Sequence, residues 1–434
     1  MHQKISFVVA LLLGLFFALG TSTRAQDNAL TLSSALDKAL ENNYGIIISE
    51  SQVDIAEMNN NWGTAGRYPS VGFDASSTNS RDILNHTSNN RLNGSVGMNW
   101  TLFDGYRITV TKNKLEKLET LAEGRSSVVV ENTIQHVILG YYNVLLQEEQ
   151  LEILRKVMAL SRDRYEYEKM RRDLGSALTY QVLQAKNVYL EDSAAFLNQQ
   201  VVMRNAIRNL NFTIGEEPSA RWNFSEKFEA DTARYNLGDL LDKMQSDNQT
   251  LQNQYVNLML SREDIRLKES DFYPSLRVSA GLDNAWSRFK NDGNDPAVNK
   301  TVSPFANLTL SYDIYTGGTR KRAVEIAKIN EEIALTEQEE MEHSLTNLLF
   351  NEYDLYHVRR TLLHIADENL EAAALNLDIA GEKFKNGAIN SFNYRDIQLI
   401  YLHAALQRLR SIYNLIDSQT SLTRLTGGFV NPQP

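Results

Sequence analysis

The sequence predicts a mainly α-helical, internally duplicated chain that also carries two β-hairpins. Short motifs recur in the same order along the two halves of the chain, which indicates the duplication. Two stretches of about 65 residues lack proline, and only 7 of the 434 residues are proline, which favours long uninterrupted helices. Apolar and polar residues alternate in other segments, as they do in β-strands with one buried face.

The duplication is visible as motif pairs at two offsets. The pairs are Leu36-Asp37-Lys38 with Leu241-Asp242-Lys243, Tyr68-Pro69-Ser70 with Tyr273-Pro274-Ser275, Phe103-Asp104-Gly105 with Tyr315-Thr316-Gly317, and Gly175 with Gly387. The offset is 241 − 36 = 205 residues for the first two pairs and 315 − 103 = 212 for the others. The sequence therefore predicts a first repeat at 26–215, a linker at 216–235, a second repeat at 236–428 and a tail at 429–434.

Each repeat contains the same three kinds of segment. A helical stretch comes first, then a β-hairpin, and then a long helical hairpin with a glycine-containing tip. The expected segments are 32–66, 68–103 and 105–212 with the tip near 174–177 in the first repeat, and 237–272, 273–315 and 318–425 with the tip near 386–389 in the second.

The alternating segments resemble membrane strands. Apolar residues share one strand face, with polar residues opposite, and aromatic residues stand near the strand ends, as at Trp100, Trp286 and Tyr312. Such a pattern is typical of tilted strands with an aromatic girdle in an outer membrane. On the strands alone, a hairpin packed on a soluble core is an equal alternative. Four membrane strands have open edges, which hydrocarbon does not tolerate, so the membrane interpretation requires more than one copy of the chain.

The long helices support an assembly of the same kind. A helix of about 65 residues is roughly 100 Å long at 1.5 Å per residue. A rod of this length cannot bury its apolar stripe within one small domain. It therefore has to pack against other rods as a coiled coil.

The first 25 residues are expected to be a secretory signal peptide. A short polar start precedes the apolar run from Ile5 to Leu19, and Thr23-Arg24-Ala25 offers a small-residue cleavage site. An uncleaved membrane anchor is the alternative. The chain has no cysteine, which excludes disulfides, thiolate metal sites and a lipid-modified cysteine.

Taken together, these motifs resemble the TolC-like outer-membrane efflux protein family, and the resemblance covers essentially the whole mature chain. It rests on the duplicated halves, Tyr-Pro-Ser before each hairpin, Leu102-Phe103-Asp104-Gly105 and Ile314-Tyr315-Thr316-Gly317-Gly318 after them, and the glycine tips. The resemblance implies a homotrimer with a shared 12-stranded β-barrel in the outer membrane of a double-membrane bacterium. A periplasmic α-barrel of twelve helices would continue this barrel.

The same resemblance implies a passive export duct in a tripartite efflux or type I secretion system. A periplasmic adaptor and an inner-membrane pump would open it, and no catalytic residue, cofactor or metal is expected. Carried over by position from Gly387, Asp396 falls on a carboxylate that forms a ring in the tunnel, and the second ring position is Asn393. A solvated helix charge is the alternative reading of Asp396.

Three further positions complete the expected pore constriction. Phe384 stands where the family usually has tyrosine, while Ile389 and Gln181 replace the charged residues of the family's tip lock, so an apolar lock is one expectation here. The expected adaptor-docking tips comprise Leu174, Gly175, Ser176 and Ala177 in the first repeat and Asn386, Gly387, Ala388 and Ile389 in the second.

Other function classes fit less well. A net charge of −10 argues against nucleic-acid binding, which needs a basic surface. His343, His357 and His364 are too widely spaced along one helix to chelate a metal ion. A secreted coiled-coil adhesin would account for the signal peptide and the rods, but it leaves the paired hairpins unexplained. A periplasmic enzyme would need a reactive constellation that the sequence does not offer.

Overall fold

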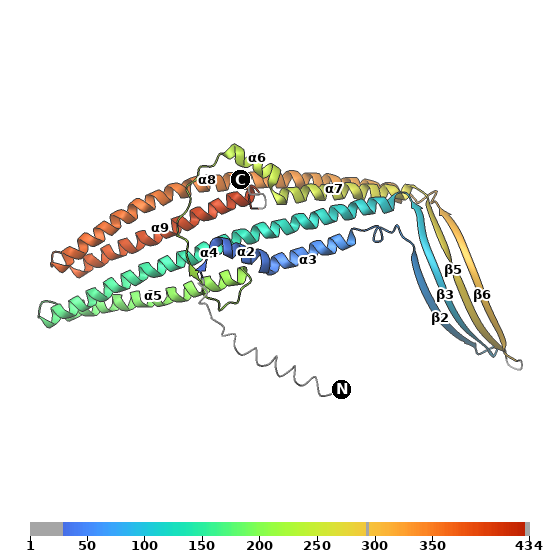
Figure 1. Ribbon diagram of the computed structural model, residues 1–434, viewed down its shortest axis with the longest axis horizontal. Coiled ribbons are helices and arrows are strands. Elements are labelled where there is room, and N and C mark those ends of the chain that lie inside the picture. The colour runs from blue at the N-terminus through green and yellow to red at the C-terminus, as the bar shows by residue number, and fades with distance from the viewer. Residues whose placement is uncertain (1–28, 292–294, 430–434) are drawn as a thin grey trace, which may run out of the picture.

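Two helical hairpins of equal size form one end of an elongated molecule, and a four-stranded sheet forms the other (Figure 1). The computed structural model describes residues 29–291 and 295–429, so the expected signal peptide lies outside the described residues. The hairpins are α4 (Arg107–Asp173) with α5 (Thr179–Thr213), and α8 (Thr319–Lys385) with α9 (Ser391–Leu425). The predicted long helical hairpins are thus confirmed. Equivalent positions of the two hairpins are 319 − 107 = 212 residues apart.

The shorter helices form one matching group in each repeat and lie beside the parts of α4 and α8 that are nearer the sheet. They are α2 (Leu32–Asn42), α3 (Tyr44–Asn59), α6 (Leu237–Asp247), α7 (Gln249–Glu269) and the 3₁₀ turn η1 (Ser270–Phe272). We expected one continuous helical stretch in each repeat, and the structure breaks both. The breaks fall at Asn43 and Asn248, whose backbones are extended.

Both asparagines break the helix in the same way. The Asn43 Oδ1 accepts a hydrogen bond from the Gly45 backbone N–H, and the Asn248 Oδ1 accepts one from Leu251. These bonds satisfy the first free N–H groups of α3 and α7. The Asn43 Nδ2 donates to the carbonyl of Thr213 and the Asn248 Nδ2 to that of Leu425, the last residues of α5 and α9. Each asparagine therefore links the start of its repeat to the end.

The core lies where the long helices cross these short ones. Tyr141 of α4 and Tyr356 of α8 are fully buried there, and their hydroxyls donate to the backbone carbonyls of Leu30 and Ala233. The predicted linker 216–235 passes through this region. It contains β4 (Asn223–Phe224), which pairs in parallel with β1 (Ala29–Leu30). The linker is thus fixed by a strand pair that the sequence analysis did not anticipate.

The larger sheet is antiparallel, with the strand order β2-β3-β5-β6. Its strands are β2 (Ser70–Asp82), β3 (Thr87–Asp104), β5 (Ser275–Asn291) and β6 (Ala297–Ser311). From their turn-forming residues we expected loops at 79–90 and 288–300, and the strands extend into both, so they are longer than expected. Tyr312 and Ile314 follow β6 instead of belonging to it. Pairing between β3 and β5 shifts register between Thr101 and Phe103, which takes Leu102 out of the regular alternation.

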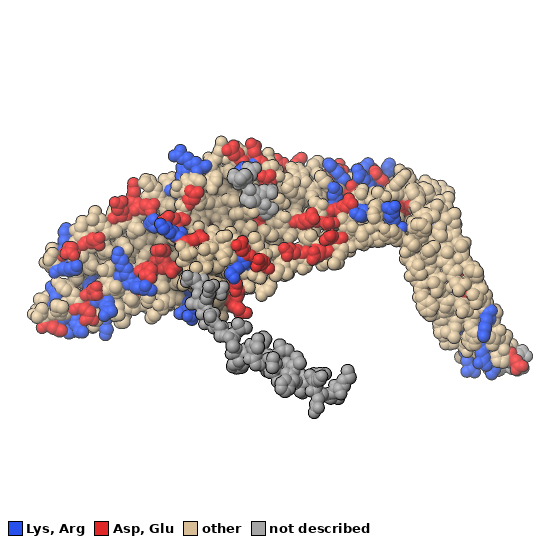
Figure 2. Space-filling view, viewed as in Figure 1, with Lys and Arg blue, Asp and Glu red and all other residues tan. Residues whose placement is uncertain are grey.

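The two faces of the sheet differ in polarity, as the alternation predicts. Phe73, Val96, Leu282 and Pro304 form one cross-strand row on the apolar face. The next row, on the polar face, comprises Asp74, Ser95, Asp283 and Ser303. Charged side chains are spread over the helical end in Figure 2, whereas most of the visible sheet carries none until its far end.

The edges of the sheet are both unpartnered in the single chain. Among the strands of residues 29–291 and 295–429, β2 pairs only with β3, and β6 pairs only with β5. β2 and β6 run in opposite directions. The geometry therefore allows β6 of one copy to pair with β2 of the next copy in an antiparallel ladder.

In the described residues, no helix combines the length and the apolar character needed to cross a membrane.

Candidate functional site: the helical tips

The two tips are built alike, each on a glycine with a left-handed backbone. Gly175 has φ 77° and Gly387 has φ 72°, a region that L side chains rarely adopt. The Ser176 N–H donates to the carbonyl of Arg171, and the Ala388 N–H donates to that of Lys383, both at 2.8 Å. Each helix therefore ends in a Schellman motif, which satisfies carbonyls at its C-terminus and reverses the chain.

The tips expose apolar side chains. Leu174 is 76% exposed, and Leu178, Tyr180 and Phe392 close to the two turns are also exposed. Six of the eight residues expected in the docking tips are exposed, and the other two, Ala177 and Ile389, are half-buried. Apolar groups that stay in water at the end of a rod provide a surface for a further protein, because covering them is favourable.

Asp396 and Asn393 lie on one exposed face of α9. They are three residues apart, so they project from the same side of the helix, together with Ile400 and His403 one and two turns further on. Within the described residues, the Asp396 carboxylate forms no ion pair. No cation of the described residues neutralises this carboxylate, so it can attract cations in the solvent next to this face of α9.

The other three expected constriction residues have roles within the chain. The Phe384 ring is buried, stacks on Tyr394 with ring centroids 4.8 Å apart, and meets the edge of Tyr167 at 5.0 Å. Ile389 is half-buried against the same cluster. The Gln181 Oε1 accepts a hydrogen bond from the Leu178 N–H at 2.9 Å and so caps the start of α5. Their part in a constriction stays a prediction.

A buried charged cluster between the hairpins was missed from the sequence. Arg395 of α9 binds both carboxylate oxygens of Asp192 of α5 at 2.8 Å. Arg164 of α4 lies beside them and donates to the carbonyl of Ser391 at 3.3 Å. Burial and the neighbouring Arg395 lower the pKa of Arg164 to about 10, although Asp192 and Glu168 oppose this shift. A contact across 203 positions leaves no local signal in the chain, so helical spacing could not reveal it.

The arrangement thus joins a two-faced sheet with free edges to two helical rods with exposed apolar tips. A family model described as outer membrane efflux protein matches residues 35–216 and 240–428. The chain belongs to this family. The two matched segments correspond to the two repeats of the chain.

Individual members of the outer membrane efflux protein family are similar to the chain at low identity. The outer membrane protein TolC of Vibrio cholerae serotype O1 is 24% identical over 218 residues. That alignment covers 48% of each protein, so the chain spans about half the length of the curated relative it matches.

Solved structures of channels have the same fold. CusC superimposes with a TM-score of 0.74 at 15% identity, covering 91% of this chain and 92% of CusC. VceC from Vibrio cholerae gives a TM-score of 0.71 at 14% identity, covering 91% and 96%. The CmeC outer membrane channel of Campylobacter jejuni gives 0.72 at 15% identity, covering 92% and 85%. These similarities establish the fold of an outer-membrane efflux channel.

Proposed function

We propose that the chain is the outer-membrane channel of a tripartite export system and that three copies close it into a continuous duct. The observation that carries this proposal is the pair of unpartnered edges on the sheet, β2 and β6. Three copies would supply twelve strands and leave no edge, which a hydrocarbon environment requires. The apolar face would meet lipid, and the polar face with Asp74 and Asp283 would line the lumen.

The helical part supports the same closure. In the described residues, α7 packs extensively against both α4 and α8, whereas its repeat equivalent α3 packs extensively against one long helix, α4. α3 consequently exposes Ile47, Ile55 and Met58, and the upper part of α8 exposes Ile326 and Ile329. If α8 of a neighbouring copy packed on α3, these residues would be buried, and α3 would have two long helices as neighbours, as α7 already has. Transfer of the apolar side chains out of water would favour this contact.

The periplasmic adaptor is proposed to cover the helical tips. The exposed Leu174 and Leu178 of the first tip and Phe392 near the second are its suggested contacts. An inner-membrane pump would supply cargo and energy, because a duct without a catalytic constellation supplies neither. The Asp396 side chains of three copies would form a carboxylate ring in the tunnel, which favours passage of cations.

The test is the mass of the particle extracted from the outer membrane in detergent, corrected for bound detergent. We expect three times the mass of the mature chain, and single-channel conductance after reconstitution into a planar bilayer. A monomer that remains in the soluble periplasmic fraction would contradict the proposal and favour a secreted rod-like protein instead.

A further inference from the structure

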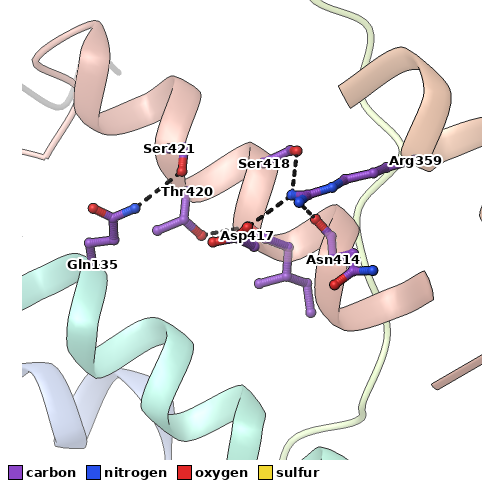
Figure 3. A network of polar contacts seen from close by, with 8 residues as sticks. Gln135, Arg359, Asn414, Asp417, Ser418, Thr420 and Ser421 are labelled. Carbon is purple, nitrogen blue, oxygen red and sulfur yellow. Dashed lines mark hydrogen bonds and ion pairs between the residues drawn. The ribbon is translucent and has the colours of Figure 1, made fainter. Parts of the chain in front are cut away.

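The internal duplication provides a template for contacts between copies. Within the chain, α4 of the first repeat packs against α9 of the second. The Gln135 Nε2 of α4 donates to the Ser421 Oγ of α9 at 3.2 Å (Figure 3). Nearer the tips, the Lys156 Nζ lies 3.3 Å from the Tyr401 hydroxyl. These two pairs fix the register of one antiparallel helix interface.

The equivalent surfaces of the other two helices do not pack on each other within the described part of the chain. α8 is the repeat equivalent of α4, and α5 is that of α9, at the offset of 212 residues. In Figure 1 α8 and α5 lie at opposite edges of the helical array, with α9 and α4 between them. If the α4–α9 interface recurs, α8 of one copy packs against α5 of the next.

The surface of α5 fits such a contact. Leu183, Leu190 and Leu197 recur every seven residues and are 54%, 52% and 59% exposed. Seven-residue spacing of leucine is the pattern of a coiled-coil seam. The α9 equivalents of the last two are Leu402, which is partly buried, and Leu409, which is only 5% exposed. The α5 stripe is therefore a helix interface that lacks its second helix.

The stripe ends in a pocket of arginines. Arg204 follows Leu197 by seven residues, and with Arg208 and Arg221 it lines a pocket of about 560 Å³. In the described part of the chain, none of the three forms an ion pair. Arg204 and Arg208 stand one helical turn apart, a spacing at which like charges repel each other. An unbalanced cluster of this kind favours a carboxylate from outside the chain.

The loop that carries Arg221 is held in place by hydrogen bonds to the Asn211 side chain of α5. The Asn211 side chain is fully buried, and its Nδ2 donates to the carbonyls of Glu217 and Ala220. The indole N–H of Trp222 donates to the Asn211 Oδ1 at 2.7 Å. Arg221 therefore stands on an ordered loop beside α5, and the pocket exists before any partner arrives.

The repeat register narrows the residues that can face Arg204. The α9 equivalent of Arg204 is Ile416, which is 5% exposed. The two contact pairs above place Ile416 level with positions 140–141 of α4. Tyr142 lies within about 3 Å of that level, at 1.5 Å per residue, and shares the seven-residue spacing of Gln135 and Lys156 that face α9. The α8 equivalent of Tyr142 is Asp354, which is exposed and forms no ion pair among the described residues.

We propose that α8 of a second copy lies along the leucine stripe of α5 and places its Asp354 carboxylate in the pocket of Arg204, Arg208 and Arg221. This inference rests on the proposed closed assembly and adds the register and the residues of its subunit contact. The Arg204 guanidinium can bind a carboxylate through two parallel hydrogen bonds, which fixes the sliding position of the two rods.

The register is tested by cross-linking, which is clean because the chain contains no cysteine. Asn347 and Asn209 are the equivalents of Gln135 and Ser421. In the variant Asn347→Cys/Asn209→Cys we expect mild oxidation to give bands of two and three chains that collapse on reduction. The matched control pairs Asn347→Cys with Ser193→Cys, about 24 Å away along α5, and should stay uncross-linked.

The charge contact is tested by reversal. Arg204→Asp and Asp354→Arg should each raise the protein concentration at which half of the detergent particles dissociate by about tenfold, and the double variant should restore it. A three-chain particle without the Asn347–Asn209 cross-link overturns the register and leaves the proposed function intact. A monomer overturns both. If Arg204→Asp weakens the particle but Asp354→Arg does not, the pocket holds another anion and the inference is wrong.

Discussion

Arg395 and Asp192 form a two-point ion pair that ties α9 of the second helical hairpin to α5 of the first, close to the tips. Both side chains are largely buried, at 15% and 9% exposure, and Arg164 lies beside them. The two hairpins otherwise meet mainly through α4 and α9. This pair therefore adds a direct link between helices that would separate if the tips moved apart.

Breaking this link should loosen the contact between the two helical hairpins near their tips. In Asp192→Ala, the guanidinium groups of Arg395 and Arg164 lose their shared carboxylate in a poorly hydrated site. Removal of one partner of a buried pair costs roughly 3–5 kcal/mol. We expect a lower Tm and a larger resting conductance in planar bilayers. The exchanged variant Asp192→Arg/Arg395→Asp serves as a control. If Asp192→Ala changes neither the Tm nor the conductance, the Arg395–Asp192 pair does not hold the two hairpins together.

Glu131 makes stability depend on pH. Burial raises the pKa of its carboxyl from 4.5 to about 7, and Arg424 only partly opposes this shift. Because the folded state holds the proton more tightly than the unfolded state, the favourable contribution is complete below pH 4.5. It is lost as the pH rises through about 7. We expect Glu131→Gln to raise the Tm at pH 8 and to leave it nearly unchanged at pH 4, measured by circular dichroism in detergent. An equal gain at both pH values would contradict the titration.

Charge on the exposed face of α9 should control ion preference. Asp396→Asn removes one carboxylate per copy, so the preference for cations in bilayer recordings should fall. Asn393→Asp adds a carboxylate one turn away on the same face and should raise that preference. Unchanged reversal potentials in salt gradients for both variants would show that this face of α9 does not border the conducting path.

Asn248 should contribute more to stability than an ordinary helix cap. Its side chain is 4% exposed, caps α7 and donates to the carbonyl of Leu425. Loss of the cap alone costs about 1–2 kcal/mol. In Asn248→Ala the buried carbonyl of Leu425 also loses its partner, so the loss should lie at or above the upper end of that range. Denaturant unfolding of Asn248→Ala beside Asn236→Ala, whose side chain caps α6 by accepting from the Gly238 N–H, measures the difference. Equal losses would mean that the Leu425 contact adds nothing.

The sequence predicted the parts of the fold that depend on local periodicity. The 212-residue offset, the glycines at the tips and the strand alternation all follow from spacing along the chain, and the long helices and the four antiparallel strands are present, although the strands are longer than expected. The breaks at Asn43 and Asn248 were missed because an asparagine within a helical pattern interrupts it only when a tertiary partner holds its side chain.

The candidate site was less predictable for the same reason. Asp396 and the tip residues were located by resemblance, and the structure places Asp396 on an exposed helix face. The Arg395–Asp192 pair joins positions 203 residues apart, and no spacing rule connects them. No pattern in the sequence indicated that the Phe384 ring is buried between Tyr167 and Tyr394 in the single chain, and its part in a constriction stays a prediction. Whether a side chain faces inward depends on neighbours that a one-dimensional pattern does not contain.

The free edges of β2 and β6 also bear on how the protein matures. A lone chain that has folded its rods still carries two rows of unsatisfied backbone groups, which no bilayer accepts and which recruit any available strand. Insertion should therefore wait for encounter between chains, and its rate should rise more steeply than linearly with the supply of newly exported protein. Overproduction of the sheet without its rods should yield aggregates, because nothing then orders the edges of the three sheets, two per copy, before they meet.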